Sequence, residues 1–148
     1  MKFAHTLRIE ASKAKVDAFL GDFERSALCL PGVEEVRSLG DGEYEGRVRV
    51  RVGPLGFNLG GRARPERGAD GRWLVHGEGN DRRIGAGVKA SLEAQLTALG
   101  PDTTDVQISA DVQFSGRLAG LGQPLIKRKA DAMVLEFTEN LRQAVAAS

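Results

Sequence analysis

Strict alternation of apolar and polar residues runs through the middle of the chain. Every second residue is apolar or glycine between residues 44 and 52, and the same pattern returns at 88–98 and 106–114. A period of two places successive side chains on opposite faces of a β-strand, so each run predicts a strand with one buried and one solvated face. Gly100-Pro101-Asp102 separates the last two runs and predicts a tight turn between antiparallel neighbours.

Helical spacing brackets this set of strands. Ser12 is suited to cap a short helix over residues 13–20, and a second short helix is predicted around residues 24–30, before Pro31-Gly32. Near the end of the chain, apolar positions spaced by three or four residues predict one helix of about 20 residues, with Pro124 in its first turn. Its stripe consists of Leu125, Met133, Val134, Phe137, Leu141 and Val145. Shorter alternating runs predict strands at residues 3–10, 57–61 and 73–75.

A meander of this size needs a cover for its apolar face, and only the last helix is long enough to supply one. We therefore predict an α+β fold in which a curved antiparallel sheet of about seven strands wraps around a long C-terminal helix. Two short helices follow the first strand. The 148 residues fit a single domain, 1–148. The 19 glycines support hairpins and bent strands, because glycine adopts positive φ without steric cost.

Composition and charge exclude several classes of protein. A net charge of +1 provides no overall field to recruit nucleic acid, so nucleic acid is not an expected partner. No run of about 18 apolar residues and no apolar N-terminal segment is present, so we expect a cytoplasmic, soluble protein. The single cysteine, Cys29, cannot form an internal disulfide, and its leucine neighbours favour a small buried side chain over a reactive thiol.

Few residue patterns support catalysis. His5 and His76 lie on different predicted strands without the spacing of metal ligands, so no metal site is predicted. The chain has no GxSxG motif, and no base neighbours Cys29 in the sequence. Gly77-Glu78-Gly79 and Gly85-Ala86-Gly87 flank strands and do not open a helix, which favours hairpin glycines over a phosphate cradle. We predict no catalytic residue and no covalently bound cofactor.

Five segments, taken together with their order and spacing, resemble one known family. They are Cys29-Leu30-Pro31-Gly32-Val33-Glu34, the strand Tyr44-Glu45-Gly46-Arg47-Val48-Arg49-Val50 with Val52-Gly53-Pro54, Gly77-Glu78-Gly79, Ala110-Asp111-Val112-Gln113, and Gly116-Arg117-Leu118-Ala119-Gly120-Leu121-Gly122. They span nearly the whole chain and are similar to the carbon monoxide dehydrogenase CoxG family. That family belongs to the START-like superfamily, so the resemblance implies the helix-grip fold.

The resemblance also implies a function. It suggests a non-catalytic accessory protein that links a molybdenum hydroxylase, such as carbon monoxide dehydrogenase, to the cytoplasmic membrane and binds a hydrophobic molecule, with a quinone expected as the bound ligand. The polar tail ending at Ser148 favours peripheral contact at the inner face of the membrane. Two alternatives stay open: a cyclase- or isomerase-like enzyme, with Glu78 and Asp111 as remote candidate groups, and a purely structural assembly factor with a filled core.

Small residues on the inner face of the sheet indicate space for a ligand. Gly46, Gly61, Ala90, Ala94 and Ala110 are predicted to face the helix, so we expect a long apolar pocket, with an ordinary packed core as the alternative. Met133 would be its adaptable wall, because an unbranched thioether adjusts to different ligands. The predicted lining is Leu30, Phe57, Leu59, Trp73, Val75, Phe114, Leu121, Leu125, Met133 and Phe137.

A second predicted site is a surface for the membrane or a partner protein. An exposed Leu-Phe pair in the turn Pro54-Leu55-Gly56-Phe57 would suit insertion into a membrane and is predicted as the portal for the ligand. Basic residues on the flanking strands and the last helix would contact anionic headgroups or the partner enzyme, and a solvated face explains them equally well. The predicted surface comprises Leu55, Phe57, Arg47, Arg49, Arg51, Arg62 and Arg64, with Lys127, Arg128 and Lys129 on the helix.

Overall fold

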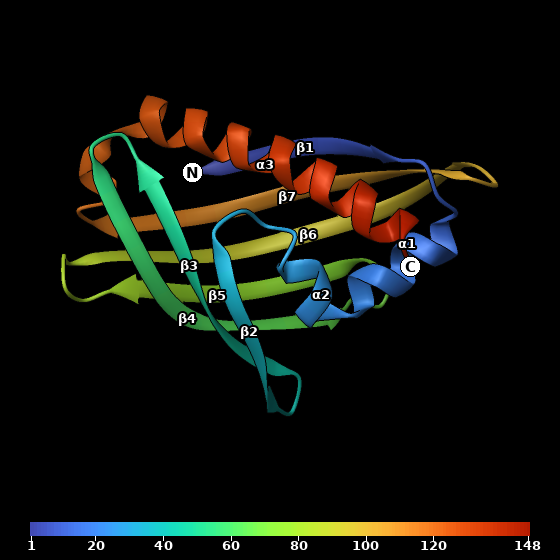
Figure 1. Ribbon diagram of the computed structural model, residues 1–148, viewed down its shortest axis with the longest axis horizontal. Helices are drawn as coiled ribbons and strands as arrows, with labels where there is room; N and C mark the ends of the chain where they lie inside the picture. The colour runs from blue at the N-terminus through green and yellow to red at the C-terminus, as the bar shows by residue number, and fades with distance from the viewer.

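In the computed structural model, which describes all 148 residues, one antiparallel sheet curves around the C-terminal helix (Figure 1). The elements are β1 (Lys2–Ile9), α1 (Lys13–Gly21), α2 (Phe23–Ala27), β2 (Val33–Gly40), β3 (Glu43–Val52), β4 (Leu55–Arg67), β5 (Trp73–Asp81), β6 (Ala86–Gly100), β7 (Thr103–Gly116), the 3-10 turn η1 (Ala119–Leu121) and α3 (Gln123–Ala146). The seven strands follow the order β1-β7-β6-β5-β4-β3-β2, so β2 to β7 form a meander and β1 pairs with β7. The predicted fold class is confirmed.

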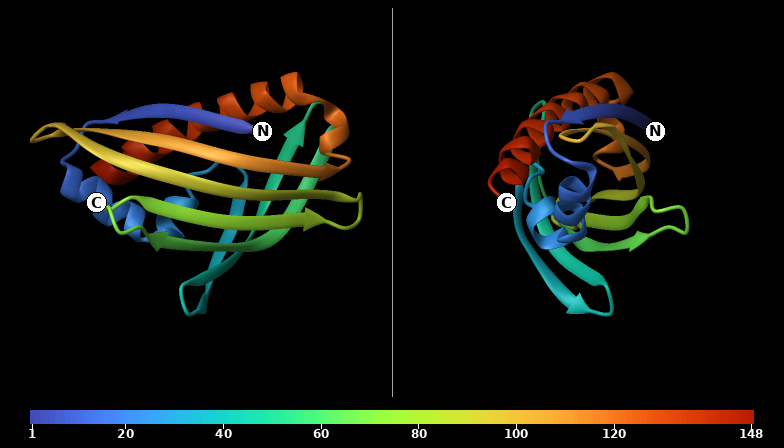
Figure 2. Two further views of the ribbon diagram at one scale, coloured as in Figure 1. Left: turned by 180° about the vertical axis from the view of Figure 1, so that it is seen from behind. Right: turned by 90° about the vertical axis from the view of Figure 1, so that its right-hand side faces the viewer.

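The two short helices lie at the end of the sheet where α3 ends (Figure 2). Ser12 caps α1 as predicted, because its hydroxyl accepts a hydrogen bond from the backbone N–H of Lys15 at 3.2 Å. Helix α2 is shorter than predicted and ends at Ala27. The chain then turns through Gly32, where φ is +90° and a Cβ atom would lie 2.2 Å from the carbonyl oxygen of Arg49, so only glycine fits this crossing.

Two separate hydrophobic cores hold the sheet to the helices. In the larger core, Val16 of α1 and Leu141 of α3 pack with β1, β6 and β7 and are fully buried. In the smaller core, Phe57 and Leu118 pack at the opposite end, where the β3–β4 and β5–β6 hairpins meet the start of α3. Residues on the concave face between these cores are only partly buried, and this gap in the packing positions the candidate site.

Helix α3 is fastened to β1 more firmly than to the other edge of the sheet. Arg142 Nε donates a hydrogen bond to the carbonyl oxygen of Arg8 at 2.9 Å. On the opposite side, Asn140 Nδ2 donates to the carbonyl oxygen of Cys29 at 2.9 Å, in the loop before β2. No hydrogen bond or salt bridge joins α3 to the edge strand β2 itself. No helix has both the length and the hydropathy needed to cross a membrane.

Asp81 joins the β5–β6 hairpin to the start of β4. Its carboxylate, 6% exposed, accepts hydrogen bonds from the backbone N–H of Asn58 at 2.9 Å and of Arg83 at 3.2 Å. The bond from Asn58 is the main cause that holds the pKa of Asp81 below its ordinary value of 3.8. Burial opposes this effect, and the guanidinium of Arg83 reinforces it. The folded protein therefore favours the charged form of this carboxyl group.

The substitution Asp81→Asn is expected to destabilise the protein near neutral pH and to have little effect in acid. A carboxylate with a lowered pKa stabilises the folded state above its unfolded pKa, and this contribution disappears as the pH falls through the lower folded pKa. Urea unfolding at a series of pH values from about 7 to about 3 measures the free energy of unfolding of both proteins. The wild type should be the more stable near pH 7, and the difference should shrink as the pH falls. A difference in the free energy of unfolding that stays the same at every pH would contradict the lowered pKa of Asp81.

Candidate functional site

A partly open cavity of about 410 Å³ lies between the two cores, under α3 and on the concave face of the sheet. Leu141 and Val106 of the larger core bound it on one side, and Leu59, which packs against the smaller core, bounds it on the other. Helix α2 supplies a further wall. Of the 30 lining residues, 20 are hydrophobic, so the cavity suits an apolar molecule.

A row of glycines explains why the space is empty of side chains. Gly46, Gly61 and Gly79 are direct neighbours across β3, β4 and β5, and all three line the cavity. The strands approach so closely here that a Cβ atom on Gly61 would lie 1.9 Å from the carbonyl oxygen of Glu78, and one on Gly46 would lie 2.5 Å from that of Glu35. Larger residues are excluded from this row, which leaves a bare strip on the concave face.

Five of the ten residues predicted for the lining do line the cavity: Leu30, Leu59, Trp73, Val75 and Phe137. Four others belong to the smaller core or pack against it: Phe57, Phe114, Leu121 and Leu125. They lie where the hairpins close over the start of α3, so neighbouring side chains fill the space around them.

Met133 is also absent from the lining, so its predicted role as the adaptable wall is wrong. The helix presents Val134, Phe137 and Leu141 to the cavity. At about 100° per residue, Val134, Phe137 and Leu141 lie within about 60° of one another around the helix, and Met133 lies about 70° from the centre of this arc, at the edge of the stripe. The apolar stripe of the sequence is wider than the part of α3 that meets the cavity.

An aromatic pair on the wall had no predicted role. Phe23 of α2 and Tyr44 of β3 both line the cavity, with ring centroids 4.9 Å apart. The alternation of residues in β3 correctly placed Tyr44 on the inner face of the sheet. Helix α2 has only five residues, too few for a helical period to show which way Phe23 faces. Their contact joins α2 to the sheet at the edge of the cavity.

Trp73 is held in one orientation at the cavity wall. Its indole Nε1 donates a hydrogen bond to Asp17 Oδ1 at 3.0 Å, which ties β5 to α1. Arg67 donates to the other oxygen of Asp17 at 2.8 Å, and its guanidinium carbon lies 4.0 Å from the centroid of the indole ring. A fixed indole beside the cavity is a suitable fluorescent reporter of its contents.

The predicted basic face of β3 and β4 is largely neutralised by glutamates. Arg47 pairs with Glu35 at 3.4 Å and Arg49 with Glu34 at 3.3 Å. Arg62 and Arg64 pair with Glu43 at 3.7 Å and 3.5 Å, whereas Arg51 makes no salt bridge. Exposed ion pairs of this kind form a solvated face, so the alternative given for Arg47, Arg49, Arg62 and Arg64 describes them better.

The predicted apolar wedge at the β3–β4 turn is wrong. Gly53 and Pro54 alone make the turn, and Leu55 already pairs with Val52 in the strand. Phe57 therefore points inward and is 1% exposed. The hairpin therefore presents no exposed Leu-Phe pair, and the smaller core packs beneath it.

No pair of acid and base groups faces the cavity. Glu78 is exposed on the outer face, opposite Arg62 and Lys89, and Asp111 is exposed near the N-terminus. His5 lies 3.4 Å from Asp131 on α3, and His76 contacts Ser91. Neither histidine lines the cavity.

Cys29 is buried, and burial raises the pKa of its thiol. A raised pKa keeps the thiol protonated near neutral pH, which agrees with the predicted unreactive side chain.

The curved sheet gripping one long helix defines a START-like, helix-grip domain. The chain belongs to the carbon monoxide dehydrogenase CoxG family, whose model matches residues 6–146. None of the curated proteins compared with the chain matches it.

Solved structures share the fold at low sequence identity. A conserved protein from Geobacillus kaustophilus has a TM-score of 0.85 and 17% identity, covering 100% of this chain and 97% of its own. A START superfamily protein from Mycobacterium smegmatis has a TM-score of 0.73 and 16% identity, covering 99% and 97%. The Zhui aromatase/cyclase from Streptomyces sp. R1128 has a TM-score of 0.70 and 15% identity, covering 99% and 93%. At such identities the likeness establishes the fold alone.

Proposed function

We propose that this protein carries a hydrophobic ligand, a membrane quinone in the first instance, and serves a molybdenum hydroxylase such as carbon monoxide dehydrogenase as a non-catalytic accessory. The apolar cavity is the observation that carries the proposal. Its volume of about 410 Å³ falls within the range of small-molecule sites, and hydrophobic residues dominate its lining. Membership of the CoxG family supports the link to carbon monoxide dehydrogenase.

The cavity argues against an enzyme of the cyclase kind. General acid and base catalysis needs titratable groups within hydrogen-bond reach of the substrate. Among the inward-facing side chains of the lining, Tyr44 is the only titratable group. The likeness to an aromatase/cyclase at 15% identity brings no catalytic residue with it. Binding without chemistry is therefore the function that we propose for this site.

The end of the molecule beside the smaller core supports a peripheral contact with the membrane. We define the hairpin end as residues 51–56, 81–86 and 116–131. A Cβ atom on Gly53 would lie 3.1 Å from Leu125, and the backbone N–H of Arg117 donates to the carbonyl oxygen of Gly85 at 3.0 Å. Two hairpin turns and the start of α3 thus form one continuous surface.

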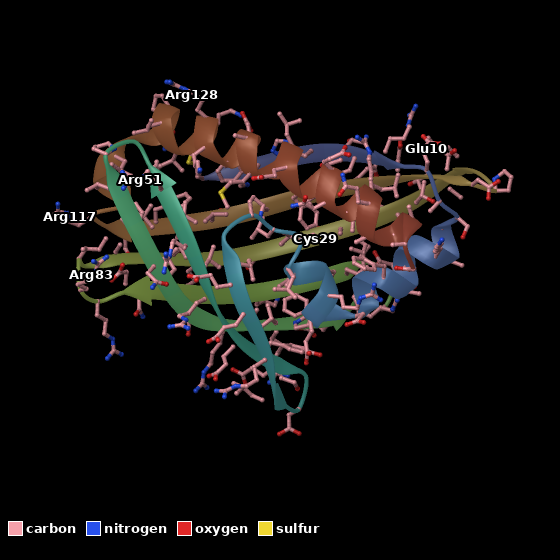
Figure 3. The ribbon with its side chains drawn as sticks, in the orientation of Figure 1. Glu10, Cys29, Arg51, Arg83, Arg117 and Arg128 are labelled. Carbon is pink, nitrogen blue, oxygen red and sulfur yellow. The ribbon has the colours of Figure 1, made fainter.

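Cations outnumber carboxylates on the hairpin end. In Figure 3, Arg51, Arg83, Arg117 and Arg128 extend from this end of the molecule, and Glu10 lies at the other. The carboxylates of the hairpin end are Asp81, which pairs with Arg83, and Asp131, which pairs with Lys127. The cations without a salt bridge are Arg51, Arg82, Arg117, Arg128 and Lys129. Such a surface complements anionic lipid headgroups. It keeps Arg51, Arg128 and Lys129 of the surface expected from the sequence, adds Arg82 and Arg117, and lacks the apolar wedge.

Thermal unfolding with and without quinone tests the proposed carrier function. A ligand that binds only the folded state stabilises it by about 2.7 kcal/mol at a concentration of 100 times Kd. For a domain of this size, that corresponds to a rise in Tm of roughly 5–10 °C. Trp73 fluorescence should change over the same titration, because the indole lines the cavity. Unchanged Tm and fluorescence at saturating quinone would favour the structural assembly factor.

A further inference from the structure

The cavity is too small for both parts of a prenylated quinone. At about 30 Å³ for each water-sized group, 410 Å³ holds roughly 14 carbon-sized groups. The ring system of a methylnaphthoquinone, with about 13 non-hydrogen atoms in a fused and closely bonded frame, would take about half of that volume by itself. A ligand that has a ring and a long chain must therefore leave a large part of itself outside.

The lining offers almost no hydrogen-bond partner for a ring carbonyl. The hydroxyl of Ser26 is in a buried residue and lies 3.4 Å and 3.5 Å from the carbonyl oxygens of Phe23 and Leu20. Tyr44 has the only other inward-facing hydroxyl, and it can serve one of the two quinone carbonyls at most. The charged side chains of the lining residues lie on the outer face of the sheet, where four form salt bridges and Glu78 is paired in register with Arg62. These residues are Glu35, Glu45, Arg47, Arg62 and Glu78.

The limited volume and the lack of hydrogen-bond donors favour a ligand whose hydrocarbon chain, and not its ring, is buried in the cavity. A carbonyl buried without a partner weakens binding by about tenfold or more, because its hydrogen bonds to water are lost. Each methylene group moved from water into the cavity strengthens binding by about fourfold. A branched hydrocarbon chain gains this contribution along its whole buried length and has no polar atom to satisfy.

We infer that the protein holds its ligand by the apolar chain and leaves the polar ring at the opening, in contact with water. The inference rests on the proposed carrier function and adds the binding orientation. The opening is assigned to the seam between α3 and β2, because Val134 and Val36 line the cavity from the two sides and no hydrogen bond closes the seam. Selectivity then lies in the chain, and different rings are accepted.

Methylnaphthoquinones with chains of increasing length test this orientation. Affinity is measured by quenching of Trp73 fluorescence, with the ring alone as the first member and geranylgeraniol as a chain without a ring. We expect the ring alone to bind weakly and Kd to fall by about fourfold per methylene until the cavity is full, near 14 chain carbons. Geranylgeraniol should compete with a Kd within about tenfold of that of the long-chain quinone.

The position of the plateau separates the possible outcomes. Tight binding of the ring alone, with a plateau after the first few chain carbons, would overturn the orientation and leave the carrier function intact. A series in which no member binds would overturn the carrier function as well.

Accessibility of the ring gives an independent readout. Dithionite in the aqueous phase should reduce the long-chain quinone bound to the protein nearly as fast as the same quinone in detergent. Reduction slowed by about 100-fold or more would place the ring inside and contradict the inference.

Discussion

Replacing Val134 with tryptophan should abolish quinone uptake while leaving a folded protein. Val134 projects from α3 into the cavity. An indole in place of an isopropyl group takes the space of about four methylene groups, each of which contributes about 0.8 kcal/mol to binding, so affinity should fall on the order of 100-fold. The Tm shift produced by quinone in the wild type should disappear. Titration by differential scanning fluorimetry measures both quantities.

The neighbouring substitution Leu135→Trp is the matched control. Leu135 is 74% exposed on the same helix. The substitution therefore adds the same indole outside the cavity and should leave quinone binding unchanged. Stability separates an open cavity from a packed core, because overpacking a core costs about 1–3 kcal/mol, whereas an open cavity accepts the added volume. At about 2–4 °C for each kcal/mol, unliganded Val134→Trp that melts roughly 3–12 °C below Leu135→Trp would show that the interior is packed.

Local alternation was sufficient to predict the strands and the face that each side chain occupies. Val88, Leu92 and Val106 point inward because a period of two depends only on neighbours along the chain. The helical stripe likewise predicted that Phe137 and Leu141 face the sheet. The fold class follows from such local patterns, since a meander of this size and one long helix have few ways to bury their apolar faces.

The errors concern contacts between residues far apart in the sequence. Phe57 is two residues past a turn and looked exposed, but Leu118 covers it from the connection before α3. The arginines of β3 were predicted without partners because β2 was not assigned beside them, and Glu34 and Glu35 of β2 neutralise two of them.

The cavity itself depends on register across the sheet. Gly46 and Gly61 were recognised as small inward residues, but the row that they form with Gly79 exists only once the pairing of three strands is known. Likewise, the hairpin end gathers its cations from three segments that are distant in the chain. The sequence singled out Arg51, Arg128 and Lys129, but it did not group Arg82 and Arg117 with them, because only the folded sheet brings these segments together.

Reversing two charges of the hairpin end should remove binding to anionic vesicles. The wild type should sediment with vesicles that contain phosphatidylglycerol and not with neutral vesicles, and added salt should weaken the binding by screening. Arg117 and Arg128 are exposed and form no salt bridge, so both are available to lipid phosphates. Each basic residue near the surface contributes about 1 kcal/mol, so Arg117→Glu with Arg128→Glu should weaken binding by at least about 30-fold.

A second pair of reversals, Lys13→Glu with Lys15→Glu, controls for net charge. These lysines are exposed on α1, at the opposite end of the molecule, and form no salt bridge. The change in total charge is the same, so a contact through the hairpin end predicts affinity within about threefold of the wild type. Equal losses in both variants would mean that binding follows net charge alone. If the wild type binds no anionic vesicle, the membrane contact is wrong. The hairpin end would then face an acidic surface of the partner enzyme. The same four substitutions can test that contact by co-sedimentation with the enzyme.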